Sequence, residues 1–327
     1  MRPFTHDAPD LWGHLARLLR AVPAGRVTTF GDLAAGLGDK RAAIWVGTAC
    51  RRPPAEWQPN GTESVPVWRA TRADGECVLP HQADRLAAEG VPVADGRAAS
   101  AGLRVSDFPP PRPLDAVRER HEAFAARVET PAGPPPFDPA GPVAAVDVAY
   151  PEPGVARAAW VEMGPESDAV VYERAVEVPI RFPYVSGYLM DRELPAYAIL
   201  FDLVQKDCRN PPVILVDGNG ILHPRRCGVA SALGVLADVP TVGVAKKRLC
   251  GTETLPAPGL VGGVMHVDGE ERGRTVRPRG TGGKPLFVSP GHRCDAAAAE
   301  ALVRRRLGPT FLPTPLHLAD RLSKRRG

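Results

Sequence analysis

Two aspartates lie within or directly after strongly apolar stretches of the sequence. Asp147 interrupts the stretch 143–148, and Asp217 follows the stretch 213–216. A carboxylate in a buried strand loses its hydration, and two of them on neighbouring strands favour a divalent cation that compensates their charge. The alternative is structural, with Asp147 at a strand end and Asp217 in a turn with Gly218.

Three other polar side chains have the chemistry to assist such a site. Glu193 lies in a charged triplet just before Pro195, where a solvated helix cap is the usual explanation. His292 follows an apolar run and precedes a capped helix, and loops at strand ends collect functional residues in open α/β sheets. A lone histidine is nevertheless more often structural. Lys246 ends another apolar run, either as an ordinary basic terminus or as a phosphate contact.

The composition is that of a globular protein with two domains. A chain of 327 residues is long enough for each domain to bury its own core. The net charge of +4 permits a polyanionic partner without requiring one. No two of the six cysteines form a Cys-x-x-Cys motif, which argues against zinc and redox sites of that type. The chain has no apolar run long enough to span a membrane, so the sequence predicts a soluble, cytoplasmic protein.

The first hundred residues have the pattern of a winged helix-turn-helix domain. Apolar spacing predicts helices over 10–22 and 40–51, with a shorter one between them capped by Thr29. Asp74-Gly75 separates two short extended runs and predicts a hairpin wing, and a last helix covers 81–90. The small and Pro-rich residues 101–113 predict a linker, so the domains are 1–100 and 114–327.

The second domain alternates strands and helices. A helix over 114–128 precedes three successive strands, and β-α-β units follow. This order predicts an α/β fold, a mixed sheet with helices on both faces. The expected strands are 142–150, 156–163, 169–178, 211–218, 241–247 and 284–292, with a hairpin over 259–279, and the expected helices are 195–207, 228–239 and 295–307.

Several motifs of this second domain, in the same order, resemble the endonuclease V family over residues 114–327. They are RFPYVSGYLMDRELP, then VILVDGNGILHPRRCGVASALGVLADVPTVGVAKKRLCG, and then KPLFVSPGHR. The resemblance implies an RNase H-like fold with strand order 3-2-1-4-5. It also implies a monomeric deoxyribonuclease that nicks DNA at the second phosphodiester on the 3′ side of deoxyinosine, in repair of deaminated bases.

Carried over position by position, the resemblance implies a set of site residues. Asp147, Glu193 and Asp217 become the carboxylates that hold Mg²⁺, or Mn²⁺, with His292 near the metal, while Lys246 faces the substrate. Tyr184 becomes the wedge that stacks beside the lesion. The pocket of the flipped base is implied at Leu189, Gly218, Gly220, His223, Gly243 and Leu249. The sequence departs from the family at Ser186, Asp191 and Leu316-His317.

The first domain resembles the DNA-binding domain of alkylguanine DNA alkyltransferases over residues 11–92. Val67 and Trp68 occupy the places of the nucleophilic cysteine and its histidine, so no alkyl transfer is expected. The resemblance is therefore to the alkyltransferase-like proteins, although Ile44 replaces their inserted arginine. Residues expected to contact DNA are Phe30, Lys40, Arg41, Arg51, Arg52 and Trp68, and the alternative for the basic ones is a solvated helix face.

The sequence thus favours a metal-dependent endonuclease behind a silent DNA-holding domain, with DNA that contains deoxyinosine or other deaminated bases as partner. Two alternatives stay open. A ribonuclease acting on inosine-containing RNA would use the same catalytic residues. A non-enzymatic sensor of DNA damage would predict an incomplete set of carboxylates, whereas all three are present.

Overall fold

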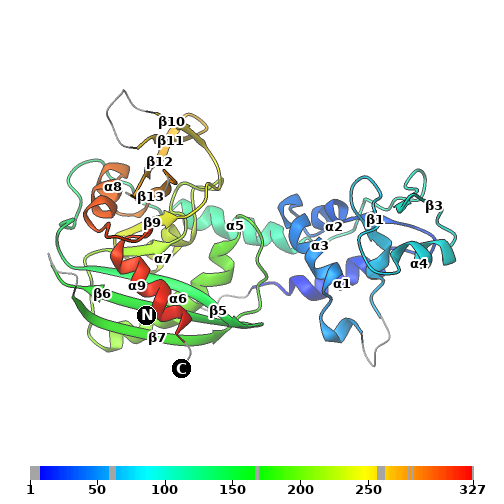
Figure 1. Cartoon of the computed structure of the whole chain (residues 1–327), viewed down its shortest axis with the longest axis horizontal. Coiled ribbons are helices and arrows are strands. Elements are labelled where there is room, and N and C mark those ends of the chain that lie inside the picture. The colour runs from blue at the N-terminus through cyan, green and yellow to red at the C-terminus, as the bar shows by residue number, and fades with distance from the viewer. Residues whose placement is uncertain are drawn as a thin grey trace. The chain divides into compact units, whose positions relative to one another are not determined.

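The chain divides into two compact units in the computed structural model, which describes residues 8–58, 64–165, 169–255, 262–278, 280 and 283–325. Residues 8–119 and 182–186 form the first unit, and the rest of the described chain from residue 120 onward forms the second. Figure 1 labels the elements of both units. Within the described residues, none of the helices combines the length and apolar character needed to cross a membrane.

The first unit is a small helical domain with short strands (Figure 1). Strand β1 pairs in parallel with β2, and β3 pairs antiparallel with β4. The helices are α1 (Leu11–Arg20), α2 (Phe30–Gly36), α3 (Ala43–Arg51) and α4 (Gln82–Ala88), and the strands are β1 (Thr28–Thr29), β2 (Ala70–Thr71), β3 (Val93–Ala94) and β4 (Arg97–Ala98).

Capping residues begin two of these helical segments as expected. The Thr29 side chain accepts from the backbone N–H of Asp32, whose carboxylate accepts from the Thr29 N–H in return, so a complete capping box opens α2. Asp39 caps the 3₁₀ turn Lys40–Ala42 that leads into α3. The helices of the predicted helix-turn-helix are confirmed.

The wing of the first unit differs from the prediction. A tight turn forms around Gly75, which has φ +82°, but the residues before it pair with β1. The residue after it, Glu76, bridges to Arg97 of β4. A side chain at Gly75 would place Cβ 2.5 Å from the Ala98 carbonyl oxygen, so the turn is packed against β4 and needs glycine.

Residues 101–113, expected to be a linker, are packed on the first unit. Arg104 forms a two-bond ion pair with Asp32, with distances of 2.8 and 2.7 Å, which helps hold the pKa of that carboxyl below its usual value against the opposing effect of burial. Phe108 is buried against Gly36. The change of unit comes between residues 119 and 120, within helix α5 (Pro113–Ala125).

Over the residues that the structure describes, the second unit contains a nine-stranded mixed sheet, and Figure 1 labels most of its strands. Its first five strands lie in the order β7-β6-β5-β8-β9, which is the predicted order 3-2-1-4-5, and β13, β12, β11 and β10 extend it beyond β9. The strands are β5 (Val143–Glu152), β6 (Val155–Met163), β7 (Val170–Pro179), β8 (Ile214–Asp217), β9 (Thr241–Ala245), β10 (Thr252–Thr254), β11 (Val264–Val267), β12 (Glu270–Val276) and β13 (Leu286–His292).

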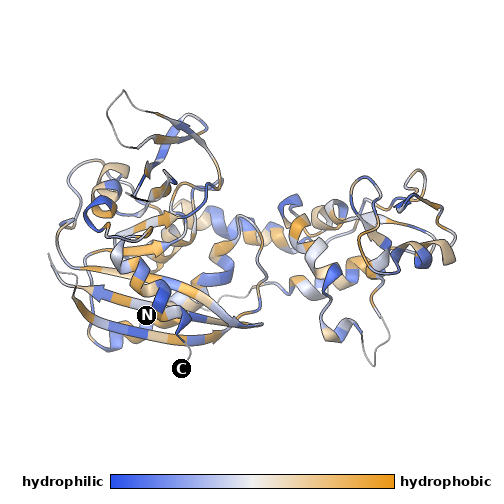
Figure 2. Cartoon of the chain, in the orientation of Figure 1, coloured by the Kyte–Doolittle hydropathy of each residue, from blue (hydrophilic) through white to orange (hydrophobic). Residues whose placement is uncertain are grey.

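Helices cover both faces of this sheet. Figure 2 shows hydrophobic residues along the central strands, as expected for strands buried on both sides. Alternate residues of β5 enter different cores: Ala144 and Val146 pack with α6 and α7, whereas Val143 and Ala145 pack with α8 and α9. The helices are α6 (Leu189–Lys206), α7 (Val229–Ala237), α8 (Ala296–Arg305) and α9 (Thr314–Lys324).

Two helices differ from the sequence expectations. Helix α6 begins at Leu189 and continues through Pro195, where the sequence predicts its start, so Glu193 lies within the helix. Pro195 is the seventh residue of α6 and lies inside the helix, where its missing N–H costs one hydrogen bond of the i→i−4 type. Helix α9 has no counterpart among the predicted elements.

Candidate active site

Three aspartates from distant parts of the chain meet at one edge of the sheet. Strands β5 and β8 are parallel with Val146 opposite Val216, so the residues that follow lie level on adjacent strands, Asp147 in the middle of β5 and Asp217 at the end of β8. Helix α9 adds Asp320, and one carboxylate oxygen from each of the three lies within 4.8 Å of the others. Such a group of oxygens can hold a divalent cation.

The cluster is electrostatically crowded. Asp147 is 5% exposed, and its burial together with the charge of Asp217 raises its pKa from 3.8 to about 7. The Ser323 hydroxyl donates to its Oδ2 at 2.6 Å. Lys246 lies with Nζ 2.6 Å from Asp217 Oδ2 and 3.5 Å from Asp320 Oδ1, so its ammonium offsets part of the negative charge. It therefore lies beside two of the three carboxylates.

Glu193 lies near the cluster on helix α6. Its side chain is buried, which raises its pKa to about 8, and the charges of Asp217 and Asp147 add to that rise. The Tyr150 hydroxyl donates to Glu193 Oε1 at 2.7 Å, which favours the ionised form and orients the carboxylate. The Arg192 guanidinium lies 4.2 Å from the centre of the Tyr150 ring and covers it.

Sequence reasoning missed Asp320. Its helix carries buried Leu316, Ala319 and Leu322 at spacings of three, with Pro315 in the first turn. This spacing and the early proline are signals of an amphipathic helix, but the basic residues that follow are equally typical of a flexible tail and of a contact. Asp320 accepts from Lys324 at 2.7 Å, one turn further along α9.

The prediction that places His292 near the metal site is wrong. His292 is the last residue of β13, which runs antiparallel to β9 and pairs with it at Thr241. Asp217 is level with Val244, three residues further along β9 and so about 10 Å away along the strand direction, besides the separation across the strands. His292 Nδ1 accepts from the Glu129 N–H at 3.2 Å, and burial lowers the pKa of the imidazole.

The glycines expected in the base pocket are places of close backbone approach. A Cβ at Gly220 would lie 1.9 Å from the Pro290 carbonyl oxygen, and one at Gly243 would lie 2.4 Å from the Gly220 nitrogen. Gly218 has φ +153°, and a Cβ there would meet Val229 at 2.5 Å. The segment after β8 is therefore main chain packed on main chain, next to Asp217.

The side chains expected around that pocket differ in accessibility. Leu189 is half-buried, with Cδ2 3.7 Å from the Cβ position at Gly218, and Leu249 is half-buried beyond β9. His223 is buried and holds its own loop: Nε2 donates to the Gly187 carbonyl at 3.2 Å, and Nδ1 accepts from the Arg225 N–H. Tyr184, the expected wedge, is 64% exposed.

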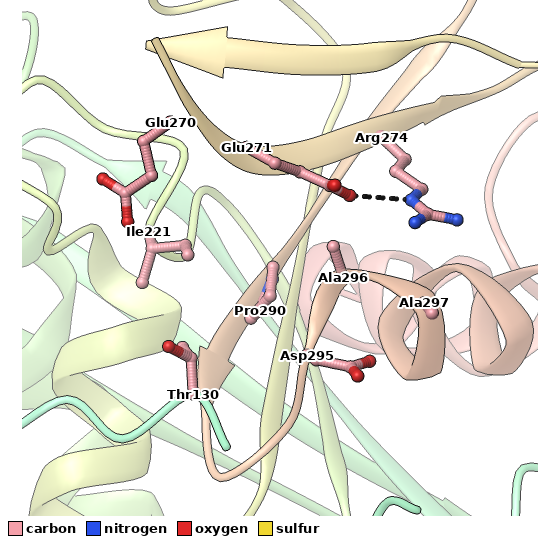
Figure 3. A pocket seen from close by; sticks show the side chains of 9 residues that line it. All are labelled: Thr130, Ile221, Glu270, Glu271, Arg274, Pro290, Asp295, Ala296 and Ala297. Carbon is pink, nitrogen blue, oxygen red and sulfur yellow. Dashed lines mark hydrogen bonds and ion pairs between the residues drawn. The ribbon is translucent and has the colours of Figure 1, made fainter. Parts of the chain in front are cut away.

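A different pocket of about 230 Å³ contains acidic side chains with structural roles (Figure 3). Glu271 pairs with Arg274 at 3.0 Å, as the dashed line in Figure 3 shows. Glu270 pairs with Arg226 and Arg272, and Asp295 caps α8. Each of these carboxylates has a partner in the chain, and none of Asp147, Asp217 and Asp320 lines this pocket.

In the first unit, the place expected for a nucleophile is closed. Val67 is buried, and the Trp68 indole N–H donates to Glu89 at 2.9 Å, while the Arg85 guanidinium lies 4.7 Å from its ring centre. Lys40, Arg41, Arg51 and Arg52 are exposed. Ile44 is 80% exposed beside a cleft of about 360 Å³, which is lined by Phe30, Gly31, Ala43, Ile44, Gly47, Arg51, Arg72 and Ala73.

The RNase H-like sheet and the acidic groups gathered beside its central strands define the chain as a nuclease. The family model for endonuclease V matches residues 126–321, and the model for the DNA binding domain of 6-O-methylguanine DNA methyltransferase matches residues 12–91. The chain belongs to the endonuclease V family.

Individual relatives agree with this assignment. The endonuclease V of Azotobacter vinelandii (strain DJ / ATCC BAA-1303) is 41% identical over 192 residues, which are 58% of this chain and 85% of the relative. The catalytic domain of human endonuclease V is 34% identical, with a TM-score of 0.57, covering 66% of this chain and 96% of its own. The Ciona intestinalis endonuclease V, in complex with a 24mer DNA containing an inosine followed by a ribo-adenosine, is 27% identical with a TM-score of 0.56 and covers 64% of this chain and 96% of its own.

Proposed function

We propose that the chain is a magnesium-dependent endonuclease that nicks DNA at the second phosphodiester on the 3′ side of deoxyinosine. The observation that carries the proposal is the convergence of Asp147, Asp217 and Asp320 beside a buried Glu193 and a lysine. The inosine-containing DNA bound by the Ciona relative supports the choice of substrate.

The residues present fit a hard divalent cation. The oxygen atoms of the three aspartates lie close enough to share one ion. Burial and the repulsion from Asp217 raise the pKa of Asp147, and a cation would offset both effects. Asp147, Asp217 and Asp320 would hold it, with Glu193 alongside. A bound Mg²⁺ would neutralise charge on the scissile phosphate and lower the pKa of a water molecule.

The remaining work falls to side chains of the chain itself. Lys246 Nζ, which pairs with Asp217 and Asp320 in the free protein, can donate to a non-bridging phosphate oxygen when substrate is present. Tyr150 keeps the Glu193 carboxylate oriented toward the cluster through its hydroxyl. The glycines after β8 allow the main chain to approach a flipped base, with Leu189 beside them and Leu249 proposed at its far side. Tyr184 fills the stacking space that the base leaves.

The first unit, in the same proposal, binds duplex DNA without chemistry. Its exposed basic residues at the ends of the 40–51 helical segment can neutralise phosphates, and Phe30 lines the adjacent cleft. Alkyl transfer requires a thiolate, whereas Val67 is apolar and buried. Trp68, which is half-buried, stays a candidate DNA contact.

The experiment compares matched DNA and RNA oligonucleotides that carry one inosine, with Mg²⁺ or with chelator. The intact chain should nick the DNA only when the cation is present, and Asp217→Ala should be inactive, with Asp202→Asn, a half-buried aspartate on α6, as the control. Preferential cutting of RNA would favour the ribonuclease alternative. Binding without any cutting would support the damage-sensor alternative and contradict the proposal.

A further inference from the structure

A carboxylate without a place in the cation cluster is the centre of a buried hydrogen-bond network. Asp191, on α6, is 1% exposed. Its Oδ1 accepts from Arg120 Nη2 at 2.8 Å, and its Oδ2 lies 2.5 Å from His121 Nε2. Burial of an ionised carboxylate is costly unless its oxygens are satisfied, so both bonds are needed to keep it there.

The second nitrogen of His121 fixes how the imidazole is protonated. Arg225 Nε lies 2.9 Å from His121 Nδ1. A guanidinium has only donors, so Nδ1 must be the acceptor and carries no proton. Nε2 then bears the proton and donates it to Asp191. The imidazole therefore accepts a hydrogen bond from Arg225 and donates one to the Asp191 carboxylate.

Arg225 connects this network to two chain segments beside the expected base pocket. Its Nη2 donates to the Gly187 carbonyl, and its guanidinium lies 4.3 Å from the centre of the Tyr188 ring. His223 donates to the same carbonyl at 3.2 Å. Gly187 follows directly, in the chain, the segment that carries Tyr184. The segments 187–188 and 223–225 are thus held together by one carbonyl and one arginine.

We propose that His121, fixed between Asp191 and Arg225, is a positioning residue that sets the segments 187–188 and 223–225 in the arrangement required for the substrate base. This inference rests on the proposed function, because it assigns the network to substrate recognition in the same reaction. It assigns no chemistry to the network, since none of its members belongs to the cluster of Asp147, Asp217 and Asp320.

The test begins with Asp191→Asn. An amide offers one acceptor oxygen where the carboxylate uses two, so either Arg120 or His121 faces a donor. Loss of this hydrogen-bond network, called the lock below, should raise the KM for inosine-containing DNA about 10-fold or more, which is the cost of roughly one buried hydrogen bond to a charged group. The kcat should stay within about 3-fold of the wild-type value. Asp202→Asn, on the same helix, is the matched control.

A second variant guards against misfolding of the first. Arg225→Lys keeps the charge but cannot reach His121 Nδ1 and the Gly187 carbonyl together, so it should show the same rise in KM. Arg226→Lys is its control, because the neighbouring Arg226 pairs with Glu270. If thermal unfolding shows that Asp191→Asn and Arg225→Lys are both folded and the KM of both is unchanged, the inference is overturned.

An independent measurement needs no nuclease activity. In protein labelled with ¹⁵N-histidine, His121 should show a protonated Nε2 and an unprotonated Nδ1, with the signal assigned by its loss in His121→Gln. Asp191→Asn should change this pattern and the Asp202→Asn control should not. If the wild-type chain fails to nick inosine DNA, the proposed function fails, while the ¹⁵N pattern still decides whether the lock exists. A pattern with Nδ1 protonated would refute the lock.

Discussion

Cation affinity should rise steeply with pH, because the carboxyls of the site hold protons to unusually high pH. The pKa of Asp147 is about 7, so the ionised fraction of this carboxyl is about 0.9 at pH 8 and about 0.1 at pH 6. Because the cation binds the ionised form, Mg²⁺ should bind about 10-fold more weakly at pH 6 than at pH 8. If Glu193, with a pKa of about 8, must ionise as well, its fraction falls from about 0.5 to about 0.01, and the combined loss reaches about 500-fold.

Titration calorimetry with Mg²⁺ at pH 6 and pH 8 measures this difference directly. Running each titration in two buffers of different ionisation enthalpy counts the protons released on binding. Asp147→Asn should bind weakly and release fewer protons, and Asp202→Asn should match the wild type. Affinities that agree within about 3-fold at the two pH values, with no proton release, would refute the electrostatic reasoning.

The same pKa shift has a consequence for stability in the absence of metal. The folded pKa of Asp147 lies above the ordinary 3.8, so the folded state binds more protons than the unfolded state between about pH 4 and pH 7. Stability contributed by this group is present below that window and is lost as pH rises through it. Mg²⁺ should therefore raise Tm more at pH 8 than at pH 5, and an equal rise at both would contradict this.

Three further changes have clear expected results. Asp320→Asn should weaken Mg²⁺ binding and reduce nicking at least 10-fold, as judged by calorimetry and a gel assay, because it removes one charge from the cluster. Tyr150→Phe should lower kcat about 10-fold by removing the donor to Glu193, while a Glu193→Gln background should hide the effect. Gly220→Ala should lower Tm sharply, since the new Cβ would meet the Pro290 carbonyl at 1.9 Å, and an unchanged Tm would show that this loop yields.

The sheet could be predicted because its signals are local. Apolar runs, turns and capped helices predict the strands and a mixed α/β sheet, and the resemblance supplies the strand order that the structure has. The pairing of Asp147 with Asp217 follows from the parallel register of β5 and β8, which places the two residues level on adjacent strands. Glu193 was found by resemblance, although the helix that holds it begins before the proline that marks its expected start.

The errors concern direction and tertiary contact. His292 stands at the end of an antiparallel strand, whose last residue lies at the opposite edge of the sheet from the ends of β5 and β8. The local sequence shows that a residue ends a strand, but it does not show whether that strand runs parallel or antiparallel to its neighbours. Asp320 was missed because the basic sequence after it is also typical of a tail. Only the packing of α9 on the sheet, a tertiary contact, brings Asp320 to the other two aspartates.

The hydrogen bond between Ser323 and Asp147 joins positions 176 residues apart. During synthesis, β5 leaves the ribosome long before α9 is made. Asp147 and Asp217 therefore lack Asp320 and Ser323 through most of the translation of this unit. At about 5–20 residues per second this interval is on the order of ten to thirty seconds. A nascent or prematurely ended chain therefore carries an incomplete group of carboxylates, and the proposed cation site can form only after α9 has been translated.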